Sequence, residues 1–487
     1  MDKFNKYKFI CFISRNFTEI IIEFLLKDIY LLLKCNKYLL GLFQSKILKY
    51  ITFHSCIKIP NKNIYQLEVS RYYDTDDTFL ASFSNLISLN CDARQLTHCA
   101  SSKTLQSLRL HNNHNVSIPN NFLSLSTLTH LELSCFGEDI IKALPESLLS
   151  LTLVSTYIKF DILPEKLTKL SFSYEYNIEY LYEHNIEGIL PDSLTDLIIK
   201  PHIPHSVLPK NLTRLEYSGW KTYSDTLVKL PSLLTYLTFN NSFNEIIPPE
   251  FLPMGLISLK LGYNFNQFIS EYVLPETLTE LIFYGRFNQE IFENQLPSQL
   301  QKLIFGDFFN KPLRKGVLQE NLKHLVLGDE FNHKLEPDTL PPSLISLEFG
   351  YKYNQKLEIH VLPSNLTKLK FGYCFNKILY EGILPENLTE LEFGSSFNQI
   401  LDKGSLPDEL LFLSFGNNFN QPLFHIPRKL KRLKFGRYFN QKIEKNILPP
   451  TLKWLTINSH YNKQKLSRNI LGTPLIKIIR TKPNRRY

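Results

Sequence analysis

The sequence predicts a repeat solenoid, built mainly from a parallel β-sheet with one short strand in each coil of about 22 residues. Three observations predict it: a periodic aromatic–Asn pair, a leucine triple that repeats in step with the pair, and a scarcity of alanine. Alanine occurs at only four positions, whereas Phe occurs 36 times and Tyr 25 times, which favours strands over helices.

The aromatic–Asn pair sets the period. It recurs every 22 residues, apart from one step of 20 that ends at Phe439. The pairs begin at Phe243, Phe265, Phe287, Phe309, Phe331, Tyr353, Phe375, Phe397, Phe419, Phe439 and Tyr461. A fixed interval of this size is typical of units that stack on their neighbours.

The leucine triple predicts the strand of each coil. In the unit that begins at Leu252, the triple is Leu256, Leu259 and Leu261. Leu259 and Leu261 are two residues apart, so they point to the same face of an extended chain. Equivalent strands run in the same direction and therefore pair in parallel, and the chain must coil back between them.

The rest of the unit suggests how the coil turns. Pro253 fixes its own φ and suits the entry to the coil. Gly262 recurs after most strands or is replaced by Asn, from which we expect a sharp left-handed bend. We expect Phe265 and its equivalents to stack inside the coils, and Asn266 and its equivalents to bond turn backbone.

Looser copies of the triple extend the array toward the N-terminus. They begin at Ile64, Leu86, Leu105, Leu128, Leu148, Leu167, Leu194 and Leu212, which gives 19 candidate units in all. We therefore expect four segments: 1–60, helical; 61–229, irregular repeats; 230–470, regular repeats; and 471–487, a C-terminal cap and basic tail.

Charge and cysteine usage bound the class of protein. The net charge of +9, from 55 basic and 46 acidic residues, is mild for 487 residues. The basic tail residues Lys477, Arg480, Lys482, Arg485 and Arg486 are interpreted as a solvated terminus, because nucleic-acid or membrane binding needs a larger basic face.

Seven scattered cysteines without a Cys-x-x-Cys pair predict a reducing, cytoplasmic location. The apolar segment 20–33 carries Glu23, Lys27 and Asp28, so we expect no membrane span.

Motifs that carry chemistry do not stand out. The sequence has no Gly-x-Gly-x-x-Gly, no P-loop and no Gly-x-Ser-x-Gly. His111 and His114 are close in sequence, as are His202 and His205, but neither pair has a further ligand at metal-site spacing. We therefore predict a non-enzyme without catalytic residues, metal, cofactor or small-molecule ligand.

The repeat unit resembles a known family. Residues 384–399 read L-P-E-N-L-T-E-L-E-F-G-S-S-F-N-Q, which is similar to the FNIP repeat, a relative of the leucine-rich repeats found in amoebae and in the large DNA viruses that infect them. The resemblance is specific over residues 230–465 and weaker over 64–229. It implies a leucine-rich-repeat-like fold and, because FNIP proteins often carry an F-box, a helical N-terminal segment.

The first 60 residues resemble an F-box in part. Residues 17–26 fit a first helix, and Asp28-Ile29 followed by Cys35-Asn36-Lys37-Tyr38 is similar to the second part. The segment lacks the Leu-Pro start, and Tyr38 stands one place early for the usual Trp. The resemblance implies that a Skp1-like adaptor docks on Ile21, Leu25, Leu26, Ile29, Leu32, Leu33 and Tyr38. The alternative is a plain helical cap over the first open coil.

The exposed strand positions are the candidate partner-binding face, because they vary from unit to unit. The candidates are Lys368, Lys370, Glu390, Glu392, Phe412, Arg432, Lys434 and Trp454, which combine both charge signs with aromatic anchors. With the F-box resemblance, they predict a monomeric substrate-recognition subunit of a Skp1–cullin–F-box (SCF) type ubiquitin ligase, acting in the cytoplasm or, for a viral protein, in the host cytoplasm. The alternative is a scaffold for a protein partner with no link to ubiquitin. Nucleic-acid binding through the tail is the third and least favoured hypothesis.

Overall fold

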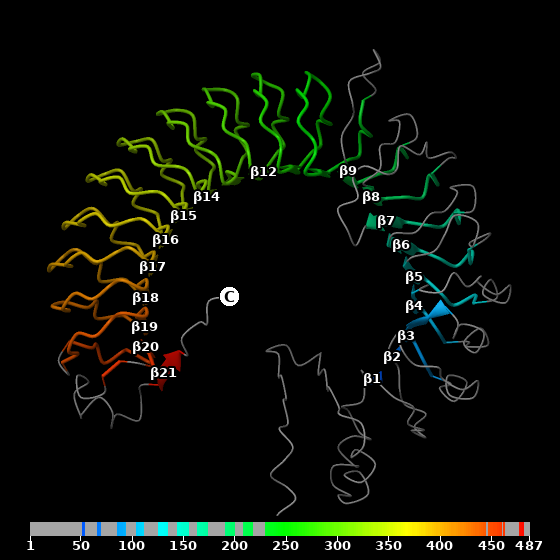
Figure 1. The fold of residues 1–487 in the computed structure, drawn as a ribbon. Coiled ribbons are helices and arrows are strands. Elements are labelled where there is room, and N and C mark those ends of the chain that lie inside the picture. Colours follow the sequence, from blue (N-terminus) through cyan, green and yellow to red (C-terminus); the bar gives the residue numbers. More distant parts are fainter. Residues whose placement is uncertain are drawn as a thin grey trace, which may run out of the picture. The chain divides into compact units, whose positions relative to one another are not determined.

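A computed structural model gives the architecture of the chain (Figure 1). It describes residues 51–53, 66–69, 85–93, 104–111, 125–134, 144–154, 163–173, 190–199, 208–217, 229–444, 447–459, 461–462 and 477–481. The chain divides into two compact units, unit 1 from Met1 to Leu215 and unit 2 from Glu216 to Tyr487.

Every described element is a short strand. Unit 1 contains β1 (Ile51–Phe53), β2 (Gln66–Val69), β3 (Ser88–Asp92), β4 (Ser107–His111), β5 (His130–Ser134), β6 (Ser150–Val154), β7 (Lys169–Ser173) and β8 (Asp196–Ile199), and the boundary falls within β9 (Arg214–Tyr217). Unit 2 continues with β10 (Tyr236–Phe239), β11 (Ser258–Leu261), β12 (Glu280–Phe283), β13 (Lys302–Ile304), β14 (His324–Val326), β15 (Ser346–Glu348), β16 (Lys368–Lys370), β17 (Glu390–Glu392), β18 (Phe412–Ser414), β19 (Arg432–Lys434), β20 (Trp454–Asn458) and β21 (Lys477–Thr481).

Consecutive strands pair in parallel, from β1 to β8 in unit 1 and from β10 to β21 in unit 2. The register is that of the sequence repeat, so Leu347 is opposite Leu369, which in turn is opposite Leu391. Strands β2 to β20 each begin two residues after one of the 19 predicted unit starts. The predicted parallel solenoid is therefore confirmed in the described residues.

Both ends add strands that the sequence reading missed. Ile51–Phe53 pairs with β2, although residues 1–60 were expected to form a helical segment or cap. Lys477–Thr481 pairs with β20 inside the segment interpreted as a cap and tail. The predicted F-box-like helices, in residues 17–38, lie outside the described residues.

Three four-residue turns shape a regular coil of unit 2. In the first coil, the amide of Phe251 bonds the Pro248 carbonyl, that of Leu256 bonds Pro253, and that of Phe265 bonds Gly262, at 3.4, 3.1 and 3.1 Å. The strand lies between the second and third turns. In Figure 1 the coils of unit 2 follow an arc that has its strands on the concave side.

The core of unit 2 consists of stacked rings, as predicted. Phe375 is fully buried, and its ring centroid lies 6.2 Å from that of Tyr353 and 6.1 Å from that of Phe397. A second aromatic, Phe371 in the same coil, stacks on Phe375 at 3.8 Å. Two parallel aromatic ladders thus fill the inside of the coils and stabilise the stacking.

The asparagines bond turn backbone, as expected, and do so between coils. Asn376 Oδ1 accepts a hydrogen bond of 2.9 Å from the amide of Asn398, and the pattern continues from Asn244 to Asn440. The following Gln joins in, since Gln399 Nε2 donates to the Asn376 carbonyl at 3.2 Å. Each rung pairs a backbone group that would otherwise be left unpaired at the turn.

The expected left-handed bend at the repeated glycines is wrong. Gly262 and its equivalents do not have positive φ, but a Cβ on Gly372 would meet the Gly350 oxygen at 1.7 Å. Glycine is required there because successive coils approach closely. The left-handed residues instead occupy the third place of the first turn, at Glu250, Tyr272, Asn294, Gly316, Asp338, His360, Gly382 and Gly404.

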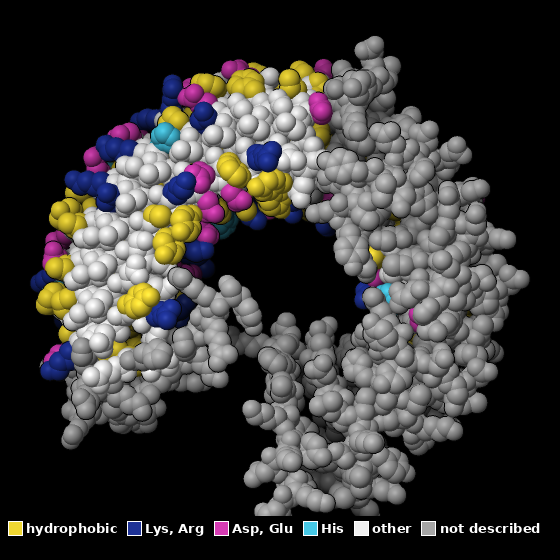
Figure 2. All heavy atoms as spheres, in the orientation of Figure 1, with side chains coloured by type: hydrophobic (Ala, Val, Ile, Leu, Met, Phe, Trp, Pro, Cys, Tyr) yellow, Lys and Arg dark blue, Asp and Glu magenta, His cyan; other side chains and the backbone are white. Residues whose placement is uncertain are grey.

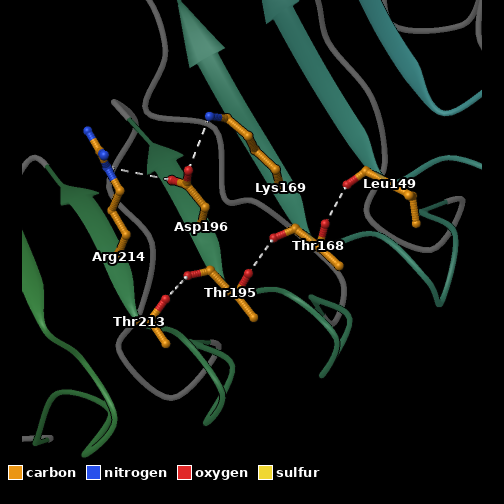
Figure 3. A network of polar contacts seen from close by, with 7 residues as sticks. All are labelled: Leu149, Thr168, Lys169, Thr195, Asp196, Thr213 and Arg214. Carbon is orange, nitrogen blue, oxygen red and sulfur yellow. Dashed lines mark hydrogen bonds and ion pairs between the residues drawn. The ribbon is translucent and has the colours of Figure 1, made fainter. Parts of the chain in front are cut away.

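Threonine hydroxyls link coils in unit 1, as those of Thr279, Thr367 and Thr389 do in unit 2. The hydroxyls of Thr168, Thr195 and Thr213 donate to carbonyls of the preceding coil, at 2.9, 3.2 and 3.0 Å (Figure 3). On the neighbouring strand positions, Lys169 lies 3.1 Å and Arg214 3.9 Å from the Asp196 carboxylate. These polar ladders run along the outward side of β7 to β9.

Candidate functional site

The candidate site is the strand face of unit 2, defined as the outward side chains of β10 to β20. Each strand alternates an inward leucine with outward residues before and after it, which form a first and a second row. In β16, Leu369 is buried, whereas Lys368 and Lys370 are exposed. The face therefore consists of two rows of variable side chains above a constant core.

All eight predicted partner-binding residues lie on this face. The first row brings together Lys368, Glu390, Phe412, Arg432 and Trp454, and the second row Lys370, Glu392 and Lys434. The four cationic residues are exposed, and Glu390, Glu392, Phe412 and Trp454 are half-buried. The sequence-based candidates are thus neighbours in space, and their role in binding stays a prediction.

Several of these charges are already paired within the face. Lys368 lies 3.1 Å from Glu390, and Lys370 contacts Glu348. The guanidinium of Arg432 lies 4.7 Å from the centre of the Trp454 ring, a cation–π contact. These contacts link the side chains of β15 to β17 and hold Arg432 against Trp454.

Another carboxylate of the first row, that of Glu280, is also paired with a cationic side chain on the neighbouring strand. Glu280 Oε1 lies 2.8 Å from Lys302 Nζ, and Ser258 donates to its other oxygen at 2.6 Å. Burial acts to raise the pKa of Glu280, but the hydrogen bonds from Lys302 and Ser258 and the charges of Lys302 and Lys260 outweigh it, so the pKa is lowered. Glu280 therefore stays ionised and paired.

Sequence reasoning overlooked an apolar stripe in the second row. Ile282, Ile304 and Val326 are register partners on three consecutive strands. Ile282 is buried, and Ile304 and Val326 are half-buried. The sequence contained a signal for this stripe, because three consecutive units have an aliphatic residue at a position where most other units have a polar one.

Exposed aromatic residues lie on the turns that follow the same strands. Tyr263, Tyr284 and Phe308 are each about 40% exposed. Tyr263 meets Phe308 edge to face at 6.5 Å, and Arg286 lies 6.0 Å from the Tyr263 ring centre. Farther along, Tyr351 and Tyr373 stack at 4.7 Å. Figure 2 shows hydrophobic side chains grouped with charged ones along the concave edge of this unit.

Gly285 explains why this turn departs from the repeat. It has a φ of +47°, and a Cβ there would meet the Tyr263 ring at 2.3 Å. The shift of glycine by one residue lets the backbone lie against the ring of Tyr263 and brings Tyr284 to the surface. We call Tyr263, Tyr284, Arg286 and Phe308 the aromatic turn cluster.

Other site predictions remain untested. The adaptor-docking residues Ile21, Leu25, Leu26, Ile29, Leu32, Leu33 and Tyr38 lie outside the described residues. Across the described ranges, no group of three or more His, Cys, Asp or Glu side chains could hold a metal ion. Within the same ranges, no helix is long and apolar enough to cross a membrane.

Comparisons with solved structures define the class of fold. The chain is similar to CroV588, described as a novel circular LRR (leucine-rich-repeat) protein, with 29% identity, 86% of this chain and 76% of that chain covered, and a TM-score of 0.52. It also shares the fold of the chain in the TLR13–ssRNA13 complex, with 15% identity, 89% and 72% covered, and a TM-score of 0.58. The chain is a solenoid of the leucine-rich-repeat type.

The family comparison identifies the repeat itself. The model of the FNIP Repeat matches residues 226–264, 243–285, 273–308, 309–352, 331–374, 375–418 and 419–460. Residues 226–460 therefore consist of FNIP repeats, which confirms the resemblance over this part of the chain. No curated protein matched the sequence.

Proposed function

We propose that the protein is a non-catalytic interaction protein that holds a protein partner on the strand face of unit 2. The observation that carries this proposal is the contrast between constant and variable positions. The buried rungs repeat the same kinds of side chain in coil after coil, whereas the outward rows change at almost every strand. Packing accounts for the constant positions, and the variable positions are free to match the surface of a partner.

The chemistry of the face suits a protein. At about 4.8 Å per strand, the 11 strands from β10 to β20 extend over roughly 50 Å, enough for an interface of standard size. The face combines the apolar stripe, the aromatic turn cluster and mixed charges. Protein interfaces combine aromatic and Arg anchors with a polar rim in the same way.

The test compares substitutions at two aliphatic positions, the half-buried Val326 and the exposed Ile400, and measures the binding of a partner isolated by affinity purification. Val326→Asp places a charge in the apolar stripe, and Ile400→Asp places one on an exposed segment outside the strand face. We expect Val326→Asp to weaken binding about tenfold or more and Ile400→Asp to leave it unchanged. Both variants should melt close to the wild type, and equal binding by both variants would refute the use of this face.

The finer proposal is that the protein serves as the substrate-recognition subunit of an SCF-type ubiquitin ligase. Its support is the F-box-like pattern of Asp28-Ile29 and Cys35-Asn36-Lys37 ahead of the repeats. In this proposal the N-terminal segment docks on a Skp1-like adaptor, and the strand face holds the protein to be ubiquitinated.

Adaptor binding can be measured with the full chain. Co-precipitation should recover a Skp1-like adaptor with the wild type and lose it with Leu32→Asp/Leu33→Asp, while the array stays soluble. If a known F-box protein recovers adaptor and the wild type does not, the ubiquitin role is wrong. If the double variant instead makes the array insoluble, the segment is a structural cap.

A further inference from the structure

The net positive charge of the chain comes from its last 43 residues. After Glu444 the remaining 43 residues contain ten Lys and Arg and no Asp or Glu. Residues 1–444 therefore hold 45 basic and 46 acidic residues, a net charge of −1. The C-terminal end is a cationic region on an otherwise balanced molecule.

Four basic residues gather at β19 and β20: Arg432 and Lys434 on the strand face, and Lys431 and Lys453 immediately before the two strands. Only Lys453 belongs to the segment after Glu444. Lys431, Arg432, Lys434 and Lys453 are all exposed. The amide of Lys453 bonds the Lys431 carbonyl at 2.9 Å, so these two lysines occupy the same position, immediately before the strand, in adjacent coils. We call these four residues the basic patch.

The basic patch lacks the compensation found elsewhere on the face. Lys302 is paired with Glu280, Lys368 with Glu390 and Lys370 with Glu348. Among the described residues, no carboxylate forms an ion pair with any member of the patch, and the undescribed residues after 444 contain none. Like charges on neighbouring strands are destabilising. Side chains that break a folding rule without local compensation point to function.

We propose that the basic patch binds an acidic segment of the protein partner, an inference that rests on the proposed function. The Arg432 guanidinium lies 4.7 Å from the centre of the Trp454 ring and its side chain is exposed, so its donors are available to a carboxylate. Lys431 and Lys453 supply two further charges. Phe412, the register partner of Arg432, offers a half-buried apolar contact beside them. The matching ligand is a short run of Asp and Glu with one apolar residue.

The neighbouring strands favour a short acidic peptide over a nucleic acid. Glu390 and Glu392 stand on the same two rows, two strands away from β19, and are half-buried. A polyanion that followed the strand face from the patch toward β17 would meet these carboxylates. A few acidic residues, by contrast, fit within the basic patch.

The test is fluorescence anisotropy with the full-length protein and three labelled probes: a short Asp/Glu peptide with a central Leu, its Asn/Gln counterpart, and an oligouridylate. We expect the acidic peptide to bind, the amide peptide not to bind, and the affinity to fall with added salt. Lys431→Gln/Lys453→Gln should weaken acidic-peptide binding about tenfold or more. Lys356→Gln/Lys403→Gln, an equal charge loss at exposed positions outside the strand face, should change it by less than about twofold.

Three outcomes would overturn this inference. The first is that the acidic peptide does not bind, and the second is that both double variants lose the same amount of peptide affinity. The third is that the oligouridylate binds more tightly than the peptide and displaces it, which would assign the patch to nucleic acid. The proposed function is judged separately. Suppose that Val326→Asp weakens binding of the purified partner and that Lys431→Gln/Lys453→Gln does not. The partner-binding face is then supported, and the acidic-segment inference is wrong.

Discussion

At the residue scale, each repeated side chain makes a specific contact with the neighbouring coil. Phe375 fills the space between two rings, and Asn376 pairs the amide of Asn398. Both roles could be predicted, because an aromatic followed by an amide at constant intervals has few other uses in a stack. The role of glycine could not, because the sequence does not reveal how closely successive coils approach.

The two kinds of glycine should respond differently to substitution. Gly372→Ala forces a Cβ into the Gly350 carbonyl, so we expect a loss of about 3 kcal/mol or more in the free energy of unfolding. Gly382 has a φ of +82° with its nearest neighbouring atom at 4.0 Å, so Gly382→Ala should cost only about 1 kcal/mol.

Urea unfolding measures both glycine variants, with Gly255→Ala as the control. The nearest atom to a Cβ on Gly255 is 3.9 Å away and its φ is not positive, so this change should be close to neutral. A Gly382→Ala variant less stable than Gly372→Ala would contradict the close-approach explanation.

Tyr353 is a rung of the ladder that carries a hydroxyl where the other central rungs carry none. The hydroxyl is buried and has no hydrogen-bond partner among the described residues, and burial raises the pKa of Tyr353. Tyr353→Phe should therefore stabilise the protein by about 1 kcal/mol in urea unfolding at neutral pH. A loss of stability would show that the hydroxyl has a partner.

The same residue predicts a dependence on alkaline pH. Because the folded-state pKa is raised, the stability that Tyr353 contributes is complete below the unfolded value of about 10 and is lost as the pH rises through the folded value. The wild type should thus lose more stability than Tyr353→Phe between neutral pH and pH values above about 10.

At the element scale, the strands were predictable and one turn was not. The spacing of the leucines located β2 to β20, because an inward leucine on either side of an outward residue is compatible with only one register. The left-handed turn escaped notice because Glu, Tyr, Asn, Asp, His and Gly all occupy it. Side chains of such different kinds leave no pattern to recognise.

The asparagine rung tests how coils are held at the element scale. Asn376→Ala removes the acceptor of the Asn398 amide and one of the two acceptors of the Gln399 side chain, so we expect a loss of about 1 to 3 kcal/mol in the free energy of unfolding. Amide hydrogen exchange should show reduced protection at Asn398. Lys377→Ala, one residue further on, should change neither quantity, and unchanged exchange in Asn376→Ala would contradict the proposed rung.

At the scale of the whole molecule, the positions of the strand face could be predicted from the sequence, but the contacts between its side chains could not. The sequence indicated the outward positions, and the structure places the eight candidates on β16 to β20. The sequence did not reveal which charges pair across strands, or that Gly285 brings Tyr284 to the surface beside Tyr263. Those contacts depend on rotamers and on close packing between coils, which periodicity does not specify.

The most direct test of the account compares the urea unfolding of Phe375→Ala and Trp454→Ala. Phe375 is a fully buried rung, and Trp454 is a half-buried residue of the outward row. We predict a loss of about 3 to 5 kcal/mol for Phe375→Ala and less than about 1 kcal/mol for Trp454→Ala. A larger loss of stability for Trp454→Ala than for Phe375→Ala would mean that the assignment of inside and outside of the coils is wrong, and would contradict the account.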